Sequence, residues 1–504
     1  MSKASSETIS EAGDFKVDAV SITTSTGLVV DLLGSVIHIT FFESIETTAV
    51  TGNILLSDYV NLVAIGPIIG QEFIKLKLRT PGMSEEKGVI DFTENLLVVT
   101  SMKTREPLGN GVQGVLLEFT SAEMLKNERI KINRSYEGTC SELFKKIMRS
   151  DLDCTKELFV EPSEGIKKIV FPNVRPIHAI NMLKRQAIAR DGLNSPYMFY
   201  EDLKGVHFRS LASMYANPPV MKYTTSIAGS KPKNVFEDLR TVMSHQIIGN
   251  GDTLLSQRLG AYGSNLTIYD TFAKKQTRQQ FNYLDSFSKI SHANSLAGGK
   301  PGKSFPLVSE SPIEPDRAFP RAAGHRTSNP RFTVPSGRIS DFPAKSFLVP
   351  TARFHDADGV DQGTINYHHT ANGNYPYVGG DTKKWLQLRE SMLTHLELGI
   401  TANLEVHGNT LVNAGDMIEF NLPSQTAAKT EKNEKYDFFF NGQFLIKKIR
   451  HDFDFGQMRH EMVLSVVRDD LAVELELVAE SHEYENKPIL PTLDTEDFYS
   501  HLND

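Results

Sequence analysis

Residues 297–304 come close to a motif that binds phosphate. They read AGGKPGKS, whereas a P-loop has Gly where Ala297 stands, a strand before it and a helix after it. Neither flank carries the required pattern, and Pro301 stiffens the turn. A flexible basic loop is the favoured interpretation.

Two further stretches could bind a cation. Residues 355–361 (HDADGVD) hold carboxylates close together, but they lack the Gly at position six and the Glu at position twelve of a calcium-binding loop. His368 and His369 follow Tyr367, and neighbouring side chains on a strand point to opposite faces, so they chelate one ion poorly. A solvated turn and ordinary strand histidines are favoured, with a metal site as the alternative.

Possible nucleophiles lack the partners that activate them. Cys140 is expected to begin a helix, where a thiol can be acidified, but no Cys-x-x-Cys or His partner motif accompanies it or Cys154. Ser141 and Ser210 lack the Gly-x-Ser-x-Gly elbow of the α/β-hydrolases. Buried structural thiols and ordinary serines are the favoured interpretation.

Charged side chains form two small groups. Glu201 and Asp202 stand together at a predicted hairpin turn, where we expect them to be solvated. Lys184, Arg185 and Arg190 share a predicted helix; Arg185 falls opposite its apolar stripe, and the other two lie within or beside that stripe. We expect ordinary surface charge and not a binding patch. No residue is therefore assigned a catalytic, cofactor-binding or metal-binding role, and no cofactor is expected.

Composition limits the class of protein. The 504 residues are too many for one ordinary domain. A net charge of −8 gives no support for general nucleic-acid binding. Two cysteines favour a reducing compartment, and no signal peptide or membrane-length apolar run is evident. We expect a soluble protein made in the cytosol.

The elements that would position these residues are mostly strands. In residues 400–407 Ile400, Ala402, Leu404 and Val406 alternate with polar residues, which predicts a strand with one buried face. Similar strands fill residues 15–122 and 438–470. Four helices are predicted: one that starts at Ser121, and three over residues 139–149, 176–190 and 385–396. The predicted class is α+β, mainly β.

We divide the chain as follows. Residues 1–14 are a disordered segment, 15–122 a first β-barrel, and 123–222 a small α+β domain. A second such barrel, split in sequence, comprises 223–287 and 385–475; 288–384 are a Gly/Ser/Pro-rich insertion, and 476–504 an acidic tail. Strands near residues 259–281 are expected to pair with those of 400–470.

In order and in local phrases, the chain resembles the baseplate hub proteins of contractile-tailed bacteriophages. The phrases are residues 39–45 (ITFFESI), 51–58 (TGNILLSD), 65–72 (IGPIIGQE), 171–176 (FPNVRP), 199–205 (FYEDLKG), 259–264 (LGAYGS), 269–270 (YD), 406–408 (VHG), 414–416 (AGD) and 449–451 (IRH). The resemblance covers roughly residues 15–290 and 385–475.

The resemblance implies a structural subunit of the virion and no enzymatic activity. Three copies would form a homotrimeric ring whose duplicated barrels match a hexameric tail tube on one face and a trimeric central spike on the other. Implied partners are the tail tube protein, the central spike protein, baseplate wedge proteins and the tape measure protein. DNA would pass through the lumen without specific binding.

Two alternatives stay open. One is the hub portion of a related contractile injection system; no short spike repeat follows residue 480. The other is a cell-wall hydrolase carried on the baseplate, for which Glu142, Glu157 and Cys140 are the candidate residues, without a convincing partner.

Overall fold

The computed structural model describes residues 9–473, with gaps. The gaps are residues 60, 63–65, 67, 84–87, 110, 190–194, 226–231, 233, 271–273, 298–299, 309–337, 352–365, 371–372, 378–381, 424–436 and 438. The chain divides into a unit of residues 1–473 and a second unit of residues 474–504, and the first contains all the described residues. The predictions for residues 1–8 and for the acidic tail therefore lie outside the described part.

The first seven strands form one antiparallel sheet in the order β2-β1-β5-β6-β7-β4-β3. They are β1 (Lys16–Thr23), β2 (Val29–Asp31), β3 (Val36–Ser44), β4 (Thr51–Asp58), β5 (Phe73–Arg79), β6 (Val89–Gly109) and β7 (Val112–Ser121). Along β4, buried side chains alternate with more exposed ones, so one face of the sheet lines a core. We call these strands the first β unit.

Six later strands form a closed barrel. They are β13 (Met221–Thr225), β14 (Thr241–Asn250), β23 (Ile400–His407), β24 (Met417–Asn421), β25 (Gly442–Asp454) and β26 (Arg459–Arg468). They pair in the order β25-β24-β13-β14-β23-β26, and a β25–β26 pairing closes the ring. The predicted alternation in β23 is confirmed, because Ile400, Ala402, Leu404 and Val406 are at most 1% exposed.

The expected pairing of residues 259–281 with this barrel is wrong. Strands β15 (Gly263–Asp270) and β16 (Lys275–Asn282) pair with each other, and β15 pairs in parallel with β20 (Lys345–Thr351) in a separate sheet. After β14 the helix α7 (Thr253–Leu259) intervenes, capped by Asp252 and ended by Gly260 at φ +82°. This helix interrupts the run of strands, and β13 and β14 supply the barrel strands instead.

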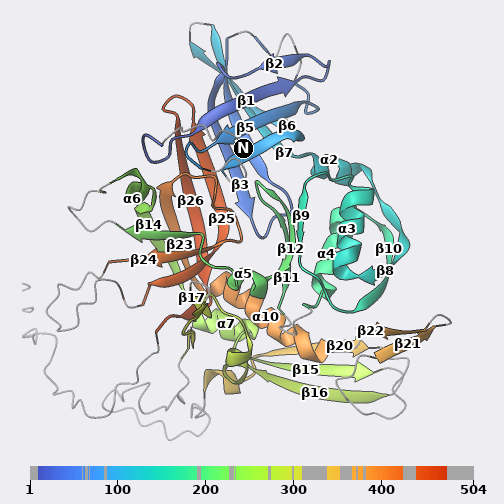
Figure 1. Ribbon diagram of the computed structural model, residues 1–504. Coiled ribbons are helices and arrows are strands. Elements are labelled where there is room, and N and C mark those ends of the chain that lie inside the picture. The colour runs from blue at the N-terminus through green and yellow to red at the C-terminus, as the bar shows by residue number, and fades with distance from the viewer. Residues whose placement is uncertain are drawn as a thin grey trace, which may run out of the picture. The chain divides into compact units, whose positions relative to one another are not determined.

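The α+β region packs two helices on one another. Its elements are α2 (Ala122–Arg129), β8 (Ile132–Thr139), α3 (Cys140–Lys146), a π-helical turn (Ile147–Asp151), β9 (Glu157–Val160), β10 (Ile166–Val174), α4 (Pro176–Gln186), β11 (Tyr197–Glu201), β12 (Gly205–Ser210) and α5 (Leu211–Tyr215). Helices α3 and α4 lie together beside β8 and β10 (Figure 1). The predicted helices are confirmed. Thr139 forms a capping box on α3, whereas the Ser121 side chain does not cap α2.

Helix α10 (Thr382–Leu398) confirms the helix predicted at 385–396, and several short elements remain. They are α6 (Val235–Leu239), α8 (Tyr283–Ser286), two 3-10 turns (Phe287–Lys289 and Ile339–Asp341), and the short strands β17 (Leu296–Ala297), β18 (Lys300–Pro301), β19 (Phe305–Pro306), β21 (Asn366–Thr370), β22 (Gly373–Tyr377) and β27 (Asp470–Leu471). No helix in the described ranges is long and apolar enough to span a membrane.

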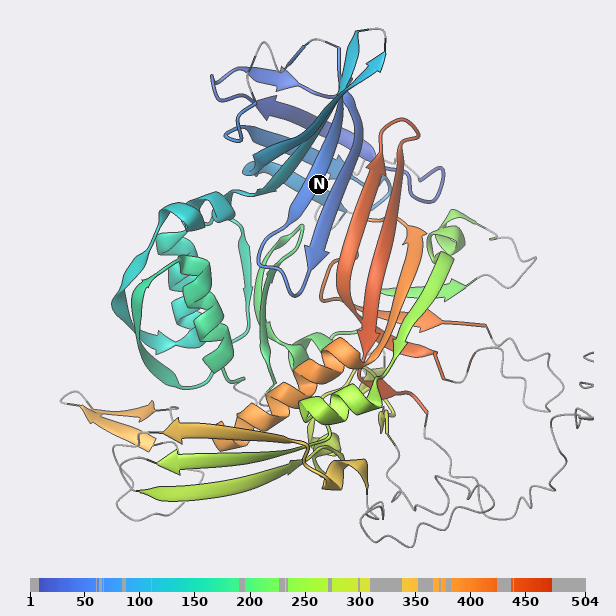
Figure 2. The same ribbon diagram turned by 180° about the vertical axis from the view of Figure 1, so that it is seen from behind.

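The first β unit and the closed barrel share one continuous sheet. Strand β25 pairs with β3 over seven residue pairs, from Lys448–Ser44 to Asp454–His38, and the two strands lie side by side in both views (Figures 1 and 2). Phe453 of β25 is fully buried in the core of the first β unit, where its ring meets Phe15 and Phe41. The barrel strand thus completes the core of its neighbour.

Candidate functional site

The stretch that approaches a P-loop is a small hairpin. Residues 297–304 include the end of β17 and all of β18, two strands of two residues each. Ser304 donates a hydrogen bond through its hydroxyl to Oδ2 of Asp470 at 2.6 Å. A two-residue strand before this segment and a carboxylate bonded to its serine do not fit phosphate binding.

The candidate nucleophiles have structural partners. Cys140 begins α3 as predicted, but burial raises the pKa of its thiol to about 11, and burial with the nearby Glu123 raises that of Cys154 to about 12. Ser141 and Ser163 exchange hydrogen bonds between backbone N–H and hydroxyl. Such thiols are not activated, and the serine is engaged in holding two segments together.

Ser210 and Glu142 stabilise the N-terminal ends of helices. The Ser210 hydroxyl donates to Glu161 and accepts from Ser213 N, which caps α5. Glu142 accepts from Thr139 N in the capping box of α3, and Glu157 is an exposed residue at the start of β9. The two carboxylates proposed for hydrolysis thus occur in separate elements.

The candidate cation-binding residues and Arg190 lie outside the described ranges or on strand β21. Residues 355–361 and Arg190 lie outside the described residues. His368 and His369 lie on β21, opposite Tyr375 and Asn374 in the register, and only the backbone is described there. Across the described ranges, no group of three or more His, Cys, Asp or Glu side chains is placed to hold a metal ion.

The prediction that Glu201 and Asp202 are solvated is wrong. They are 2% and 4% exposed, and they occupy the turn between β11 and β12. All five residues of β11 are buried, so this strand has no wet face. Side chains and backbone groups of the first β unit and the closed barrel surround the turn. We call the turn, residues 201–205, and its contacts the junction.

One half of the junction is a buried ion-pair network. Glu201 Oε1 accepts from Lys156 Nζ at 2.5 Å and from the Ser121 hydroxyl at 2.8 Å, and its Oε2 accepts from Val50 N at 3.4 Å. Lys156 Nζ also donates to Glu123 Oε2 at 2.6 Å. Burial opposes the charge on Lys156, but Glu201 and Glu123 outweigh it and raise the pKa of the lysine. The network connects the α+β region to β4 and β7.

The other half is built around Glu43 on β3. Its Oε2 accepts from Ala414 N at 2.9 Å, and its Oε1 accepts from Leu203 N at 3.3 Å and lies 3.3 Å from His451 Nε2. His451 Nδ1 is 3.1 Å from Nε2 of His460, whose pKa is held well below its usual value by burial and by His451. One carboxylate therefore joins the first β unit, the turn and the closed barrel.

Aromatic rings complete the packing of the turn. His207 lies between Phe159 and Tyr200, with ring centroids 4.6 and 4.7 Å away, and its Nε2 is 2.7 Å from Asp202 Oδ2. Tyr200 closely approaches Gly415, at φ +88°, where an added Cβ would be 2.2 Å from the phenol oxygen. Gly415 is thus required both by its turn conformation and by this close contact.

A second buried cluster attaches residues 292–306 to the closed barrel. His292 Nδ1 is 2.9 Å from Asp469 Oδ2, and Asp470 accepts from the backbone and side chain of Asn294. Burial raises the pKa of Asp470 to about 7, and the negative charge of the neighbouring Asp469 adds to this effect. The pair of β19 with β27 lies at the same place. This cluster therefore binds the start of the insertion to the closed barrel.

The solved structures to which the chain is similar include tail proteins and a component of a secretion system, all with TM-scores below 0.5. The chain is similar to a tail protein from Neisseria meningitidis, with 9% identity, a TM-score of 0.46, and coverage of 90% of this chain and 97% of the other. It is similar to a 43 kDa tail protein of a Shewanella oneidensis prophage, with 10% identity, a TM-score of 0.46 and coverage of 90% and 99%. It is also similar to a component of the E. coli type VI secretion system, with 9% identity, a TM-score of 0.38, and coverage of 92% of this chain and 79% of the other.

No protein-family model and no curated protein matches the chain. The buried Glu43 and Glu201 carboxylates of the junction accept hydrogen bonds from backbone amides and side chains of three parts of the chain. In that arrangement they fix relative positions, and both oxygens of each carboxylate are directed at the protein itself.

Sequence reasoning missed the junction because its members are far apart in the chain. Glu43, Glu201 and His451 are brought together only by the β3–β25 pairing and the turn. One local signal was present: β11 reads YMFYE, apolar on both faces up to Glu201, which is typical of a strand buried on both sides.

Proposed function

We propose that this chain is a structural subunit of a phage tail baseplate that forms a homotrimeric hub ring. The supporting observation is the β3–β25 pairing, which places two β units edge to edge in one chain with a shared core. A ring of three such chains carries six β units. It can therefore meet a hexameric tail tube on one face and a trimeric central spike on the other.

The junction supports this role physically. A subunit that transmits load between a tube and a spike needs its parts fixed, and the junction joins them by carboxylates that are buried and fully engaged. Replacing such contacts by water would require desolvated charges to separate. The two β units and the α+β region are accordingly expected to move as one body.

The partners follow from the same proposal. They are a second and third copy of the chain, the tail tube protein, the central spike protein, baseplate wedge proteins and the tape measure protein. The ring would be part of the virion, and DNA would pass through its lumen when the tail contracts. The role is structural and not enzymatic.

Light scattering on a sizing column tests the proposal. The expected mass of the chain alone is three times that of the 56.2 kDa chain, and with the spike partner the mass of the spike is added to it. A stable monomer under both conditions would overturn the hub ring. A zymogram that shows peptidoglycan clearance, lost in Glu142→Gln, would instead establish the hydrolase.

A further inference from the structure

A cavity of about 510 Å³ opens between the end of α4, the start of β11 and the helix α10. Its volume falls in the range of small-molecule sites, about 300–1,000 Å³. Five of its nine lining residues are apolar or aromatic, and the other four are the charged residues Lys184, Arg185, Arg389 and Glu390.

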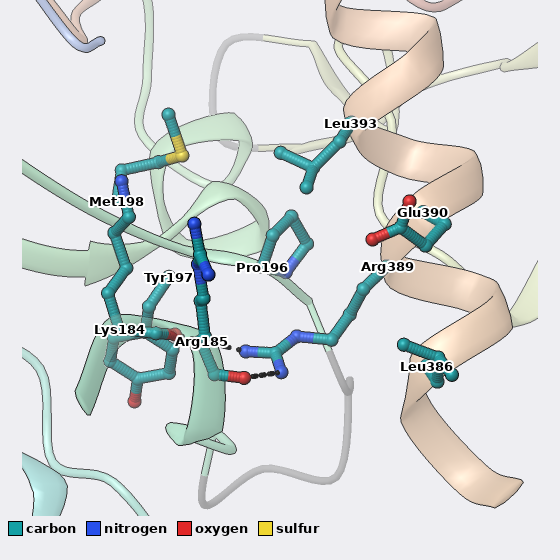
Figure 3. A pocket seen from close by; sticks show the side chains of 9 residues that line it. All are labelled: Lys184, Arg185, Pro196, Tyr197, Met198, Leu386, Arg389, Glu390 and Leu393. Carbon is teal, nitrogen blue, oxygen red and sulfur yellow. Dashed lines mark hydrogen bonds between the residues drawn. The ribbon is translucent and has the colours of Figure 1, made fainter. Parts of the chain in front are cut away.

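Arg389 of α10 braces this cavity. Its guanidinium donates to the carbonyl oxygens of Arg185 at 2.7 Å and of Lys184 at 3.3 Å (Figure 3). It also donates to the carbonyl oxygen of Ala187 at 2.7 Å. These carbonyls belong to the last turn of α4 and the residue after it, where backbone acceptors lack helical partners. Burial lowers the pKa of Arg389 to about 10. The bonded arginine thus fixes the position of the two cationic residues.

Neither Lys184 nor Arg185 forms an ion pair within 4 Å with a carboxylate of the described residues. Glu390, the carboxylate on the cavity wall, lies 3.6 Å from Lys345. Burial, followed by the neighbouring Arg185, lowers the pKa of Lys184, and the charge of Glu46 partly offsets this effect. Two adjacent cations, one partly desolvated, favour an anion between them.

The opposite wall carries two leucines. In Figure 3 Leu386 and Leu393 project from α10, with Glu390 between them on the same helix, across the cavity from Lys184 and Arg185. Met198 lies beside Lys184. An aliphatic body placed there would leave water for a surface of hydrocarbon, at about 25 cal/mol per Å². A neutral polar ligand would gain little from such a wall.

We propose that this cavity binds a small amphipathic anion, with a single carboxylate or phosphate headgroup at Lys184 and Arg185 and an aliphatic body against Leu386, Leu393 and Met198. The planar guanidinium of Arg185 can grip either headgroup with two N–H groups. The site is independent of the hub proposal, since all its residues belong to one chain.

Isothermal titration of the full chain tests this site. The probes are decanoate, decyl phosphate and the neutral decanol, all below their aggregation limits. We expect one acidic ligand per chain and at least tenfold weaker binding of decanol. The acid that binds more tightly identifies the headgroup. Equal binding of decanol would overturn the proposal.

Three variants locate the binding. Lys184→Ala with Arg185→Ala should weaken binding of the acids at least tenfold, and Leu393→Trp should abolish it by filling the space while both cations stay. Lys145→Ala, an exposed lysine of α3, is the matched control and should bind as the unaltered chain does. Unchanged affinity in the folded Leu393→Trp chain, checked by circular dichroism, would place the ligand elsewhere and refute the site.

Discussion

Replacing Lys156 by Met should loosen the junction strongly. The lysine side chain is 5% exposed and that of Glu201 3%, and the two charges are 2.5 Å apart. Removing one partner of a buried pair costs about 3–5 kcal/mol, because the other charge is left desolvated and unpaired. Here Glu123 loses the same partner. Methionine keeps a similar length and apolar stem, so the loss reflects charge more than volume.

Native-state hydrogen exchange, read by mass spectrometry, measures this effect locally. Peptides covering β7, β11 and the turn between β11 and β12 should exchange roughly a hundred- to several-thousand-fold faster, since 1.4 kcal/mol is tenfold. The matched control is Lys168→Met. Its pair with Glu137 is about half exposed on both sides, so we expect a cost of about 0–1 kcal/mol.

A double variant separates charge from packing. Adding Glu201→Gln to Lys156→Met removes the stranded charge, so the double variant should open less readily than Lys156→Met alone. An exchange rate in Lys156→Met that differs from the unaltered chain by less than about fivefold would refute the reasoning. A double variant less stable than both single variants would refute it as well.

Three further predictions follow from contacts elsewhere in the fold. Gly415→Ala should lower the thermal midpoint clearly more than Gly27→Ala, since both have positive φ but only the first would push a Cβ to 2.2 Å from Tyr200; equal losses would contradict this. Burial raises the pKa of Asp470 to about 7, so this carboxyl binds more protons in the folded chain than in the unfolded one. Between about pH 8 and about pH 6 it should contribute about 1 kcal/mol of stability that Asp470→Asn lacks, measured as the difference in pH dependence of urea unfolding between the two chains; the same pH dependence in both would contradict this. Phe453→Ala should cost about 3–5 kcal/mol and speed exchange in β1 and β3 as well as in β25, whereas an effect confined to β25 would argue against a shared core.

Local patterns were enough to predict elements but not their partners. The alternation from Ile400 to Val406 and the cap at Thr139 each act over a few residues, so they could be recognised in the sequence. Pairing is set by distant contacts, and the strands at 263–282 have the same local character whether they enter the barrel or pair with β20. The predicted fold class, α+β and mainly β, is confirmed.

The residues of the candidate site could likewise not be grouped from local sequence patterns. A hairpin turn with Glu201 and Asp202 is ordinarily wet, and only its insertion between two β units makes it buried. The cavity beside α10 was also not predictable, because Lys184 and Leu393 are more than two hundred residues apart in the sequence. Arg185, predicted to be solvated, is indeed exposed.

Electron microscopy of the purified chain, alone and mixed with its spike partner, tests the central claim most directly. Averaged end-on views should show a threefold ring with six β units around an open lumen. Separate single-chain particles, or a twofold dimer without a lumen, in both samples would contradict the hub proposal.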